Sequence, residues 1–358
     1  MSSNYGKNIN ISIFGESHGA AIGVTINGIK AGLEFDTDFI KSEIARRKPI
    51  DGISTPRKEE DEFEVLSGVF NGHTTGSPIT IIVYNKNTIS KHYDNNIIRP
   101  SHADYTGFIK YDGFNDYRGG GHFSGRITLA VVIAGAICKL ILKKNNINIT
   151  SHIKSIADVE DEKCSDILLD NQLTYSKEAW EKMKEAILNA KEKEDSVGGV
   201  IEGFVNGMPV GVGEPFFDSI ESVLSHLLFS IPAVKGVEFG DGFALTKMFG
   251  SKANDPFYTD EKGVYTLDNH NGGINGGISN GSVINVKVAI KPTPSIKAVQ
   301  KTVDIKEMKN VDYQINGRYD PCIVPRALVV VEAVLAIGIL DLYLDYLAHK
   351  GLKVWLKD

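Results

Sequence analysis

The sequence predicts an α+β protein. Several short segments alternate apolar and polar residues in the pattern of half-buried strands, as in residues 9–14, 22–26 and 79–84. Other segments repeat apolar residues at helical spacing, and two long apolar runs, 127–142 and 327–346, indicate buried helices. With 358 residues and 42% hydrophobic content, the chain can bury one large core or two moderate ones.

The first two strands, residues 9–14 and 22–26, are joined by the short loop Gly15-Glu16-Ser17-His18-Gly19. His18 lies at the apex of this loop, where its two preceding polar neighbours could fix the tautomer of the ring. A histidine near a turn is also commonly a solvated side chain, so the loop by itself leaves both interpretations open.

A helix is predicted over residues 36–47, capped by Asp36 or Thr37 and closed by a basic turn that includes Arg47. Basic residues at a helix C-terminus complement the helix dipole, which is the simpler interpretation. Arg57 follows in a loop, however, and two basic clusters that flank one irregular segment could close over a polyanionic ligand.

A strand pair is predicted over residues 66–70 and 79–84, ahead of a polar segment that begins at Arg99. In this segment His102 stands close to the carboxylate of Asp104, in surroundings too polar for a core. His102 is therefore the second candidate acid–base histidine.

Three consecutive glycines, Gly119 to Gly121, precede Ser124, Arg126 and the apolar run 127–142. Glycines let backbone N–H groups approach a ligand closely, and Ser124 stands where a helix N-cap belongs. A cation in the first turn of a helix is unfavourable, so Arg126 suggests an anion held by loop amides, helix terminus and guanidinium together. The alternative is a glycine-rich turn before an ordinary core helix.

The stretch from about residue 145 to 196 is rich in lysine and acidic residues, which predicts a more solvated, peripheral segment. It contains one helix over 177–194, and four residues form the apolar stripe of that helix: Trp180, Met183, Ile187 and Leu188. A strand over 197–205 and an amphipathic helix over 218–229 follow.

A second glycine cluster occupies residues 269–281. Its paired glycines suggest backbone pressed against a flat ligand or a neighbouring chain, with a mobile surface loop as the alternative. The strand 283–290 follows and runs into Lys291-Pro292-Thr293-Pro294-Ser295. One cation, two hydroxyls and a proline-stiffened backbone make this end of the strand a candidate phosphate clamp.

Arg318 and Asp320 stand just before the long helix 327–346. Each of the two long apolar runs carries a charge, Lys139 or Glu332, and a membrane span needs about 20 predominantly apolar residues. Both runs are therefore predicted to be core helices, and no membrane association is expected.

Composition narrows the functional class further. The net charge of −6 argues against nucleic-acid binding by bulk attraction. Cys138, Cys164 and Cys322 are far apart and lack metal-ligand spacing, which indicates reduced thiols and no metal site. The N-terminus has no signal pattern, so a cytoplasmic protein is expected.

Six motifs, in this order and at these spacings, resemble those of the chorismate synthase family over essentially the whole chain. They are Gly15-Glu-Ser-His-Gly19, Arg99-Pro-Ser-His-Ala-Asp104, Gly119-Gly-Gly-His-Phe-Ser-Gly-Arg126, the cluster 269–279, Lys291-Pro-Thr-Pro-Ser295 and Arg318-Tyr-Asp-Pro-Cys322. The resemblance implies a single domain over residues 1–358 in which antiparallel sheets enclose a helical layer, assembled as a homotetramer.

The resemblance also implies a reaction, the anti 1,4-elimination of phosphate from 5-enolpyruvylshikimate 3-phosphate to give chorismate, the last step of the shikimate pathway. Family members need reduced FMN although the reaction has no net redox change. The sequence leaves open whether the chain reduces its flavin with NADPH or relies on an external reductase. Because no reductase insertion is visible, a monofunctional enzyme is predicted.

Residue roles follow from the resemblance. His102 would protonate the departing phosphate, His18 would lie near the flavin N1–C2 carbonyl edge, and Asp320 would accept a proton through the N5 region. The cations that would gather the phosphate and two carboxylates of the substrate are Arg47, Arg57, Arg99, Arg126 and Arg318. The residues expected to contact FMN are Arg47, His122, Phe123, Ser124, Pro232, Ala233, Gly276, Lys291, Pro292, Thr293, Pro294, Ser295 and Arg318.

The chain departs from the family pattern at His122-Phe123, where Arg-Ser is common, and at Pro232, which replaces an asparagine often found against the flavin. These changes bear on flavin and nicotinamide binding. Two other functions remain as alternatives, a catalytically inactive flavin- or phosphometabolite-binding homologue and an anion-binding interaction protein. His18, His102 and Asp320 favour the enzyme, because binding alone needs arginines but no poised acids and base.

Overall fold

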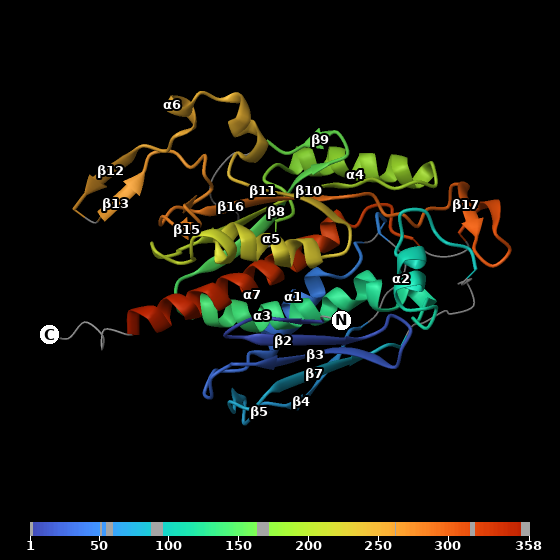
Figure 1. Cartoon of the computed structure of the whole chain (residues 1–358), viewed down its shortest axis with the longest axis horizontal. Helices are drawn as coiled ribbons and strands as arrows, with labels where there is room; N and C mark the ends of the chain where they lie inside the picture. Colours follow the sequence, from blue (N-terminus) through green and yellow to red (C-terminus); the bar gives the residue numbers. More distant parts are fainter. Residues whose placement is uncertain are drawn as a thin grey trace.

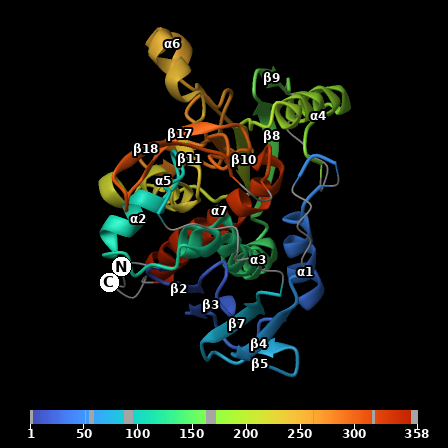
Figure 2. The same ribbon diagram turned by 90° about the vertical axis from the view of Figure 1, so that its right-hand side faces the viewer.

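Two five-stranded antiparallel sheets enclose a layer of helices (Figure 1). The computed structural model describes residues 3–50, 52–54, 60–86, 96–162, 172–261, 263–315 and 319–351. Figure 2 shows the same layers from the side, with α3 and α7 between the two sheets. The predicted α+β sandwich in one domain is confirmed.

The described strands pair as follows. The first sheet has the order β1 (Asn4–Tyr5), β2 (Asn10–Gly15), β3 (Ala21–Asn27), β7 (Ile79–Tyr84) and β4 (Phe63–Ser67). The second sheet has the order β11 (Val234–Phe239), β16 (Ile284–Ile290), β10 (Gly199–Asn206), β8 (Asn148–Ile156) and β9 (Val159–Glu160). Separate two-stranded pairs are β5 (Val69–Phe70) with β6 (His73–Thr74), β12 (Phe257–Asp260) with β13 (Gly263–Thr266), β14 (Ile274–Asn275) with β15 (Ile278–Ser279), and β17 (Gln300–Asp304) with β18 (Lys309–Tyr313).

The helices are of two kinds. The α-helices are α1 (Thr37–Arg46), α2 (Asp104–Lys110), α3 (Thr128–Lys144), α4 (Lys177–Glu192), α5 (Ile220–Ser230), α6 (Gly250–Ala253) and α7 (Val324–Gly351). The 3-10 helices are η2 (Arg118–Phe123), η3 (Gly125–Ile127), η4 (Phe216–Asp218) and η5 (Gly242–Lys247). In the middle of the layer α3 packs against α7, with β2 and β3 on the α3 side and β8 and β10 on the α7 side.

Small residues allow α3 and α7 to come close together. A Cβ atom added at Gly135 of α3 would lie 2.3 Å from Cβ of Ala333 on α7, so only glycine fits at this crossing. The continuous helical segment formed by η3 and α3, and likewise α7, is long and apolar enough to cross a membrane, but 72% and 89% of their most apolar windows are buried inside the protein. They are core helices, as predicted from the sequence.

Local sequence signals account for several helix ends. Asp36 caps α1 by accepting a hydrogen bond from the backbone N–H of Phe39 at 2.9 Å. Ser124 caps the short η3 instead of α3, because its Oγ accepts from the N–H of Arg126 at 3.3 Å and α3 begins only at Thr128. Ser124 is therefore confirmed as a cap residue, but it caps a 3-10 turn that precedes the predicted helix.

Two predictions about the periphery need correction. The stretch 145–196 is not peripheral throughout, because β8 lies inside the second sheet with Ile153 and Ile156 fully buried. Two lysines precede β8 and acidic residues follow it, so the composition of this stretch did not indicate a buried strand. In α4, Met183 and Ile187 are buried as predicted, but the side chain of Leu188 is 41% exposed. The predicted strand 66–70 is interrupted at Gly68, which separates β4 from β5.

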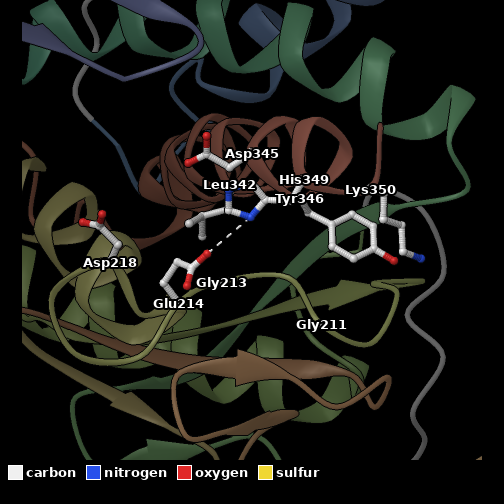
Figure 3. Close-up of a pocket in the computed structure, with 9 residues that line it drawn as sticks. All are labelled: Gly211, Gly213, Glu214, Asp218, Leu342, Asp345, Tyr346, His349 and Lys350. Carbon is white, nitrogen blue, oxygen red and sulfur yellow. Dashed lines mark ion pairs between the residues drawn. The ribbon is translucent and has the colours of Figure 1, made fainter. Parts of the chain in front are cut away.

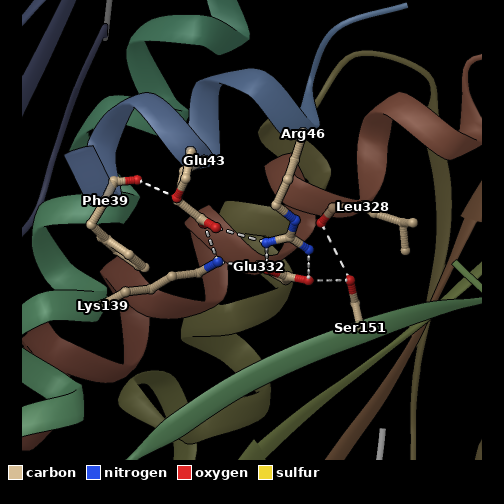
Figure 4. A network of polar contacts seen from close by, with 8 residues as sticks. Phe39, Glu43, Arg46, Lys139, Ser151, Leu328 and Glu332 are labelled. Atoms are coloured by element: carbon tan, nitrogen blue, oxygen red, sulfur yellow. Dashed lines mark hydrogen bonds and ion pairs between the residues drawn. The ribbon is translucent and has the colours of Figure 1, made fainter. Parts of the chain in front are cut away.

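A buried network of charged groups ties α1 to α3 and α7 (Figure 4). Glu332 of α7 accepts two hydrogen bonds of 2.6 Å from Arg46 and one of 2.5 Å from Lys139. Glu43 pairs with the same two cations, and the hydroxyl of Ser151 donates to Glu332 at 2.8 Å. The lysine and the glutamate that interrupt the two apolar runs thus neutralise each other inside the core.

Candidate active site

The two candidate histidines lie against one glycine loop. Gly119, Gly120 and Gly121 all have left-handed φ angles, of 62°, 83° and 54°. A Cβ atom at Gly119 would lie 2.5 Å from Cδ2 of His18, and one at Gly120 would lie 3.4 Å from Cε1 of His102. Segments more than 80 residues apart therefore bring both imidazoles to neighbouring positions of a single loop.

The GESHG loop is held directly onto the glycines. The backbone N–H of Ser17 donates to the carbonyl of Gly121 at 3.0 Å. His18 is 9% exposed and Ser17 is 1% exposed, so this loop is not the solvated turn that its composition allowed. The hydroxyl of Ser17 is buried and has no hydrogen-bond partner in the part of the chain that the structure describes.

His102 is oriented by a carboxylate. Its Nδ1 lies 2.6 Å from Oδ1 of Asp104, the first residue of α2. Arg99 donates to the same carboxylate through Nε and Nη2, both at 2.7 Å. Burial alone would raise the pKa of Asp104, but the hydrogen bonds from Arg99 and His102 hold it well below its usual range. Asp104 is thus ionised and fixes the ring of His102.

The predicted phosphate clamp adjoins this cluster. Arg99 donates to Oγ of Ser295 at 3.3 Å, and Nζ of Lys291 donates to the carbonyl of Ser101 at 2.7 Å. The N–H of Lys291 bonds the carbonyl of Ala233, which joins two predicted flavin contacts. Burial and the nearby charge of Lys235 both lower the pKa of Lys291.

Arg126 is buried behind the glycine loop. Its guanidinium forms an ion pair with Asp61, and both side chains are under 10% exposed. Its Nε donates to Oδ1 of Asn85 at 3.1 Å. The amide nitrogen of Asn85 donates in turn to the carbonyls of Glu16 and Gly19, on either side of His18. Arg126 and the histidine loop therefore share one amide side chain.

Two more arginines, Arg47 and Arg326, lie near Arg126. Arg47 donates to the carbonyl of Gly125 at 2.5 Å and to Oγ1 of Thr128 at 3.1 Å. Arg326 of α7 donates to the backbone carbonyl of Arg47 at 3.1 Å and pairs with Asp320 at 2.6 Å.

Electrostatics indicates what this group can hold. Burial, with repulsion from Arg326 and Arg126, lowers the pKa of Arg47 to about 9, and the carboxylates of Asp61 and Asp320 offset this in part. Three guanidinium groups and two carboxylates leave an excess of positive charge in a desolvated site. An anion with several charges would relieve that excess.

His122 and Phe123 directly follow the three glycines, and their side chains contact neighbouring segments. Nδ1 of His122 lies 2.8 Å from the carbonyl of Gly15, and its Nε2 lies 3.0 Å from Oγ of Ser3. The ring of Phe123 packs on α2, with its centroid 6.1 Å from that of Tyr111. Both side chains thus hold neighbouring segments against the loop.

The predicted residues are not all brought together. Gly276 lies in the turn between β14 and β15, where the carbonyl of Gly277 bonds the first residue of α5. This is the opposite end of β16 from Lys291, and seven strand residues separate the ends by about 20 Å. Figure 1 shows β15 and α2 on opposite sides of the molecule. Arg57 and Arg318 lie outside the described residues.

A cavity of about 230 Å³ lies at the C-terminal end of α7, near the second glycine cluster (Figure 3). Its lining includes Glu214, Asp218 and Asp345, with His349 3.7 Å from Glu214. Its lining contains no residue predicted for the site. The chemistry-bearing residues gather instead around the glycine loop at the other end of the helical layer.

Sequence reasoning missed Asp61, Asn85 and Arg326. Asn85 comes directly after β7, and a polar residue at a strand end is too common to single out. Arg326 stands in the first turn of α7, where a cation is unfavourable for the helix. The same argument identified Arg126 and would have identified Arg326.

Comparison with known proteins identifies the family of the chain. A sequence model of a family described as chorismate synthase matches residues 9–344. The chain belongs to the chorismate synthase family. Chorismate synthases of Thermococcus kodakarensis and Methanocaldococcus jannaschii are 46% and 44% identical to it, over 97% and 94% of this chain and 99% and 95% of theirs. That of Dehalococcoides mccartyi is 44% identical over 96% of this chain and 97% of its own.

A solved structure, a crystal structure of chorismate synthase, matches with a TM-score of 0.74 and 31% identity over 96% of this chain and 93% of that chain. The family and fold predicted from the sequence are confirmed. The comparisons favour a lyase of aromatic amino-acid biosynthesis over an inactive binding homologue.

Proposed function

We propose that this chain eliminates phosphate from 5-enolpyruvylshikimate 3-phosphate to give chorismate, with reduced FMN as its cofactor. The observation that carries the proposal is the meeting of His18 and His102 at adjacent glycines, Gly119 and Gly120. An anion-binding protein would need the arginines alone. Two imidazoles that meet one loop, of which His102 is oriented by a carboxylate, can give and take protons.

Residues near His102 fit a flavin phosphate. The loop after β16 offers the ammonium of Lys291, and Oγ1 of Thr293 is buried with no hydrogen-bond partner among the described residues. Such an orphaned hydroxyl is costly unless a ligand satisfies it. When bound, reduced FMN would supply electron density transiently while the C–O bond to phosphate breaks, without net redox change.

The side chains would divide the work as follows. His102, held by ionised Asp104, would donate a proton to the departing phosphate. His18 would donate toward the carbonyl edge of the flavin ring, and Asp320, held by Arg326, would accept the proton that leaves the substrate ring. Arg47, Arg126 and Arg99 would bind the substrate's phosphate and carboxylates, with Arg57 and Arg318 as further predicted contacts.

We also propose a homotetramer in the cytoplasm. Gly276 and Lys291 are both predicted to contact FMN but lie at opposite ends of β16, about 20 Å apart by strand length. Both could touch one flavin if Gly276 came from another copy. Sedimentation equilibrium of the full chain with and without FMN tests this, and a monomer under both conditions would contradict it.

The decisive experiment is an anaerobic assay of chorismate formation with chemically reduced FMN. Wild type should turn over, and His102→Ala should lower kcat by about 10²-fold or more, the scale for losing a general acid. A variant with near-normal turnover would remove His102 from the mechanism. With NADPH and oxidised FMN but no added reductase, we expect no activity, since we propose that an external reductase supplies the reduced flavin. Activity in that arm would make the enzyme bifunctional.

A further inference from the structure

Asn85 sits where the histidine loop meets Arg126. It follows the last residue of β7, and its backbone N–H donates to the carbonyl of Ala20 at 3.1 Å, continuing the pairing of β7 with β3. This bond fixes the main chain of Asn85 next to Ala20, which directly follows the GESHG loop. The side chain is half-buried and extends toward the loop and not along the strand.

Both amide protons of Asn85 are used on the histidine loop. Nδ2 donates to the carbonyl of Glu16 at 3.0 Å and to the carbonyl of Gly19 at 2.9 Å. These two carbonyls bracket His18 in the sequence, and the N–H of Gly19 donates to the same Glu16 carbonyl at 3.1 Å. The side chain of Asn85 therefore bridges the two ends of the turn that carries His18.

The remaining polar atom of Asn85 faces the cation. Oδ1 accepts from Nε of Arg126 at 3.1 Å, while the far end of the guanidinium pairs with Asp61. A primary amide of this length supplies two donors and an acceptor at once, which a carboxylate or a hydroxyl cannot. Asn85 thus forms hydrogen bonds with the loop of His18, a candidate acid, and with Arg126, a candidate substrate-binding cation.

We infer that Asn85 is a positioning residue, which fixes the His18 loop relative to the Arg126 guanidinium so that both meet one substrate. This inference rests on the proposed function of the site. Its consequence is that changes at Asn85 alter turnover and substrate affinity through two separate contacts. Loss of the donors releases the His18 loop, whereas a negative charge at Oδ1 competes with an anionic substrate for Arg126.

Two variants separate these contacts. Asn85→Ala removes all three bonds. Asn85→Asp keeps the shape and the acceptor, removes the donors, and adds a negative charge beside Arg126. The matched control is Asn145→Ala, at the C-terminal end of α3, where Nδ2 donates to the carbonyl of Ile141 at 2.9 Å in an exposed position. Each is assayed anaerobically with reduced FMN, and its thermal unfolding midpoint is measured.

The expected result is a fall in kcat of about ten-fold in both Asn85 variants, the scale of one or two lost positioning bonds. KM for the substrate should rise more in Asn85→Asp than in Asn85→Ala, although the former is isosteric. That order cannot come from lost packing. Values of kcat and KM equal to those of Asn145→Ala would overturn the inference, as would equal KM values in the two Asn85 variants.

Variants His18→Ala and Arg126→Ala keep this test distinct from the proposed function. If both retain wild-type turnover, the proposed function of the site fails, and the positioning role fails with it. If both lose turnover while the Asn85 variants match the control, the site stands and only the positioning role of Asn85 is rejected.

Discussion

The buried network of Figure 4 makes a sharp prediction about stability. Glu332→Gln keeps the size of the side chain but removes the charge that meets Arg46 and Lys139. Glu332 is 2% exposed, and Glu43 alone would then neutralise two cations. Breaking a buried ion pair from one side costs roughly 3–5 kcal/mol, since the remaining charge stays desolvated.

The pKa of Glu332 gives a second measure of the same cost. Burial would raise this pKa, but the charges of Lys139 and Arg46 and the hydrogen bonds from them lower it from 4.5 to about 2. At about 1.4 kcal/mol for each pH unit, the ionised form is favoured by about 3 kcal/mol. Because the folded pKa is depressed, this stabilisation is present above pH 4.5 and is lost as pH falls toward 2.

Urea unfolding followed by circular dichroism measures the effect. At pH 7 we expect Glu332→Gln to lower the free energy of unfolding by about 3 kcal/mol with an unchanged m-value, and the difference from wild type to shrink below pH 4.5. The control is Glu178→Gln in α4, which breaks an exposed pair with Lys182 and should change little. A loss in Glu332→Gln no greater than in the control, or one independent of pH, would refute the electrostatic reasoning.

Two further predictions concern the site. Gly119→Ala should lower kcat/KM by at least about ten-fold, because its Cβ would lie 2.5 Å from the ring of His18 and its φ is 62°. Gly125→Ala is the control and should stay near wild type, since no atom of the described residues lies within 4 Å of the added Cβ. Asp104→Asn should lower kcat by about 10- to 100-fold with a smaller change in KM, since an amide cannot stabilise the protonated ring of His102; an unchanged pH profile of kcat would contradict this role.

Much of the helical layer was predictable because its signals are local. Asp36 marks the start of α1, and the apolar runs mark α3 and α7 to within a few residues. The strand β8 was missed, since its hydrophobic residues are embedded in a stretch rich in lysine and acidic residues and its burial comes from α7. The average composition of a segment does not show which of its side chains are buried, because burial in a sheet depends on the individual position of each residue.

The candidate site was predictable in its chemistry but not in its connections. The motifs name His18, His102, Arg99 and Lys291, and the structure gathers these around one end of the helical layer. Nothing in the sequence indicates that Asn85 bonds the loop of His18, because that contact spans 66 to 69 residues and depends on the pairing of β3 with β7.

The sequence by itself determined the family, the α+β class and the kinds of side chain available for catalysis, because motif order and periodicity are properties of the chain alone. Only the tertiary structure decided which of those side chains meet. It paired Lys139 with Glu332 inside the core, set two imidazoles on adjacent glycines, and left Gly276 at the far end of β16. Long-range contacts follow from sheet pairing and helix packing, which no local pattern specifies.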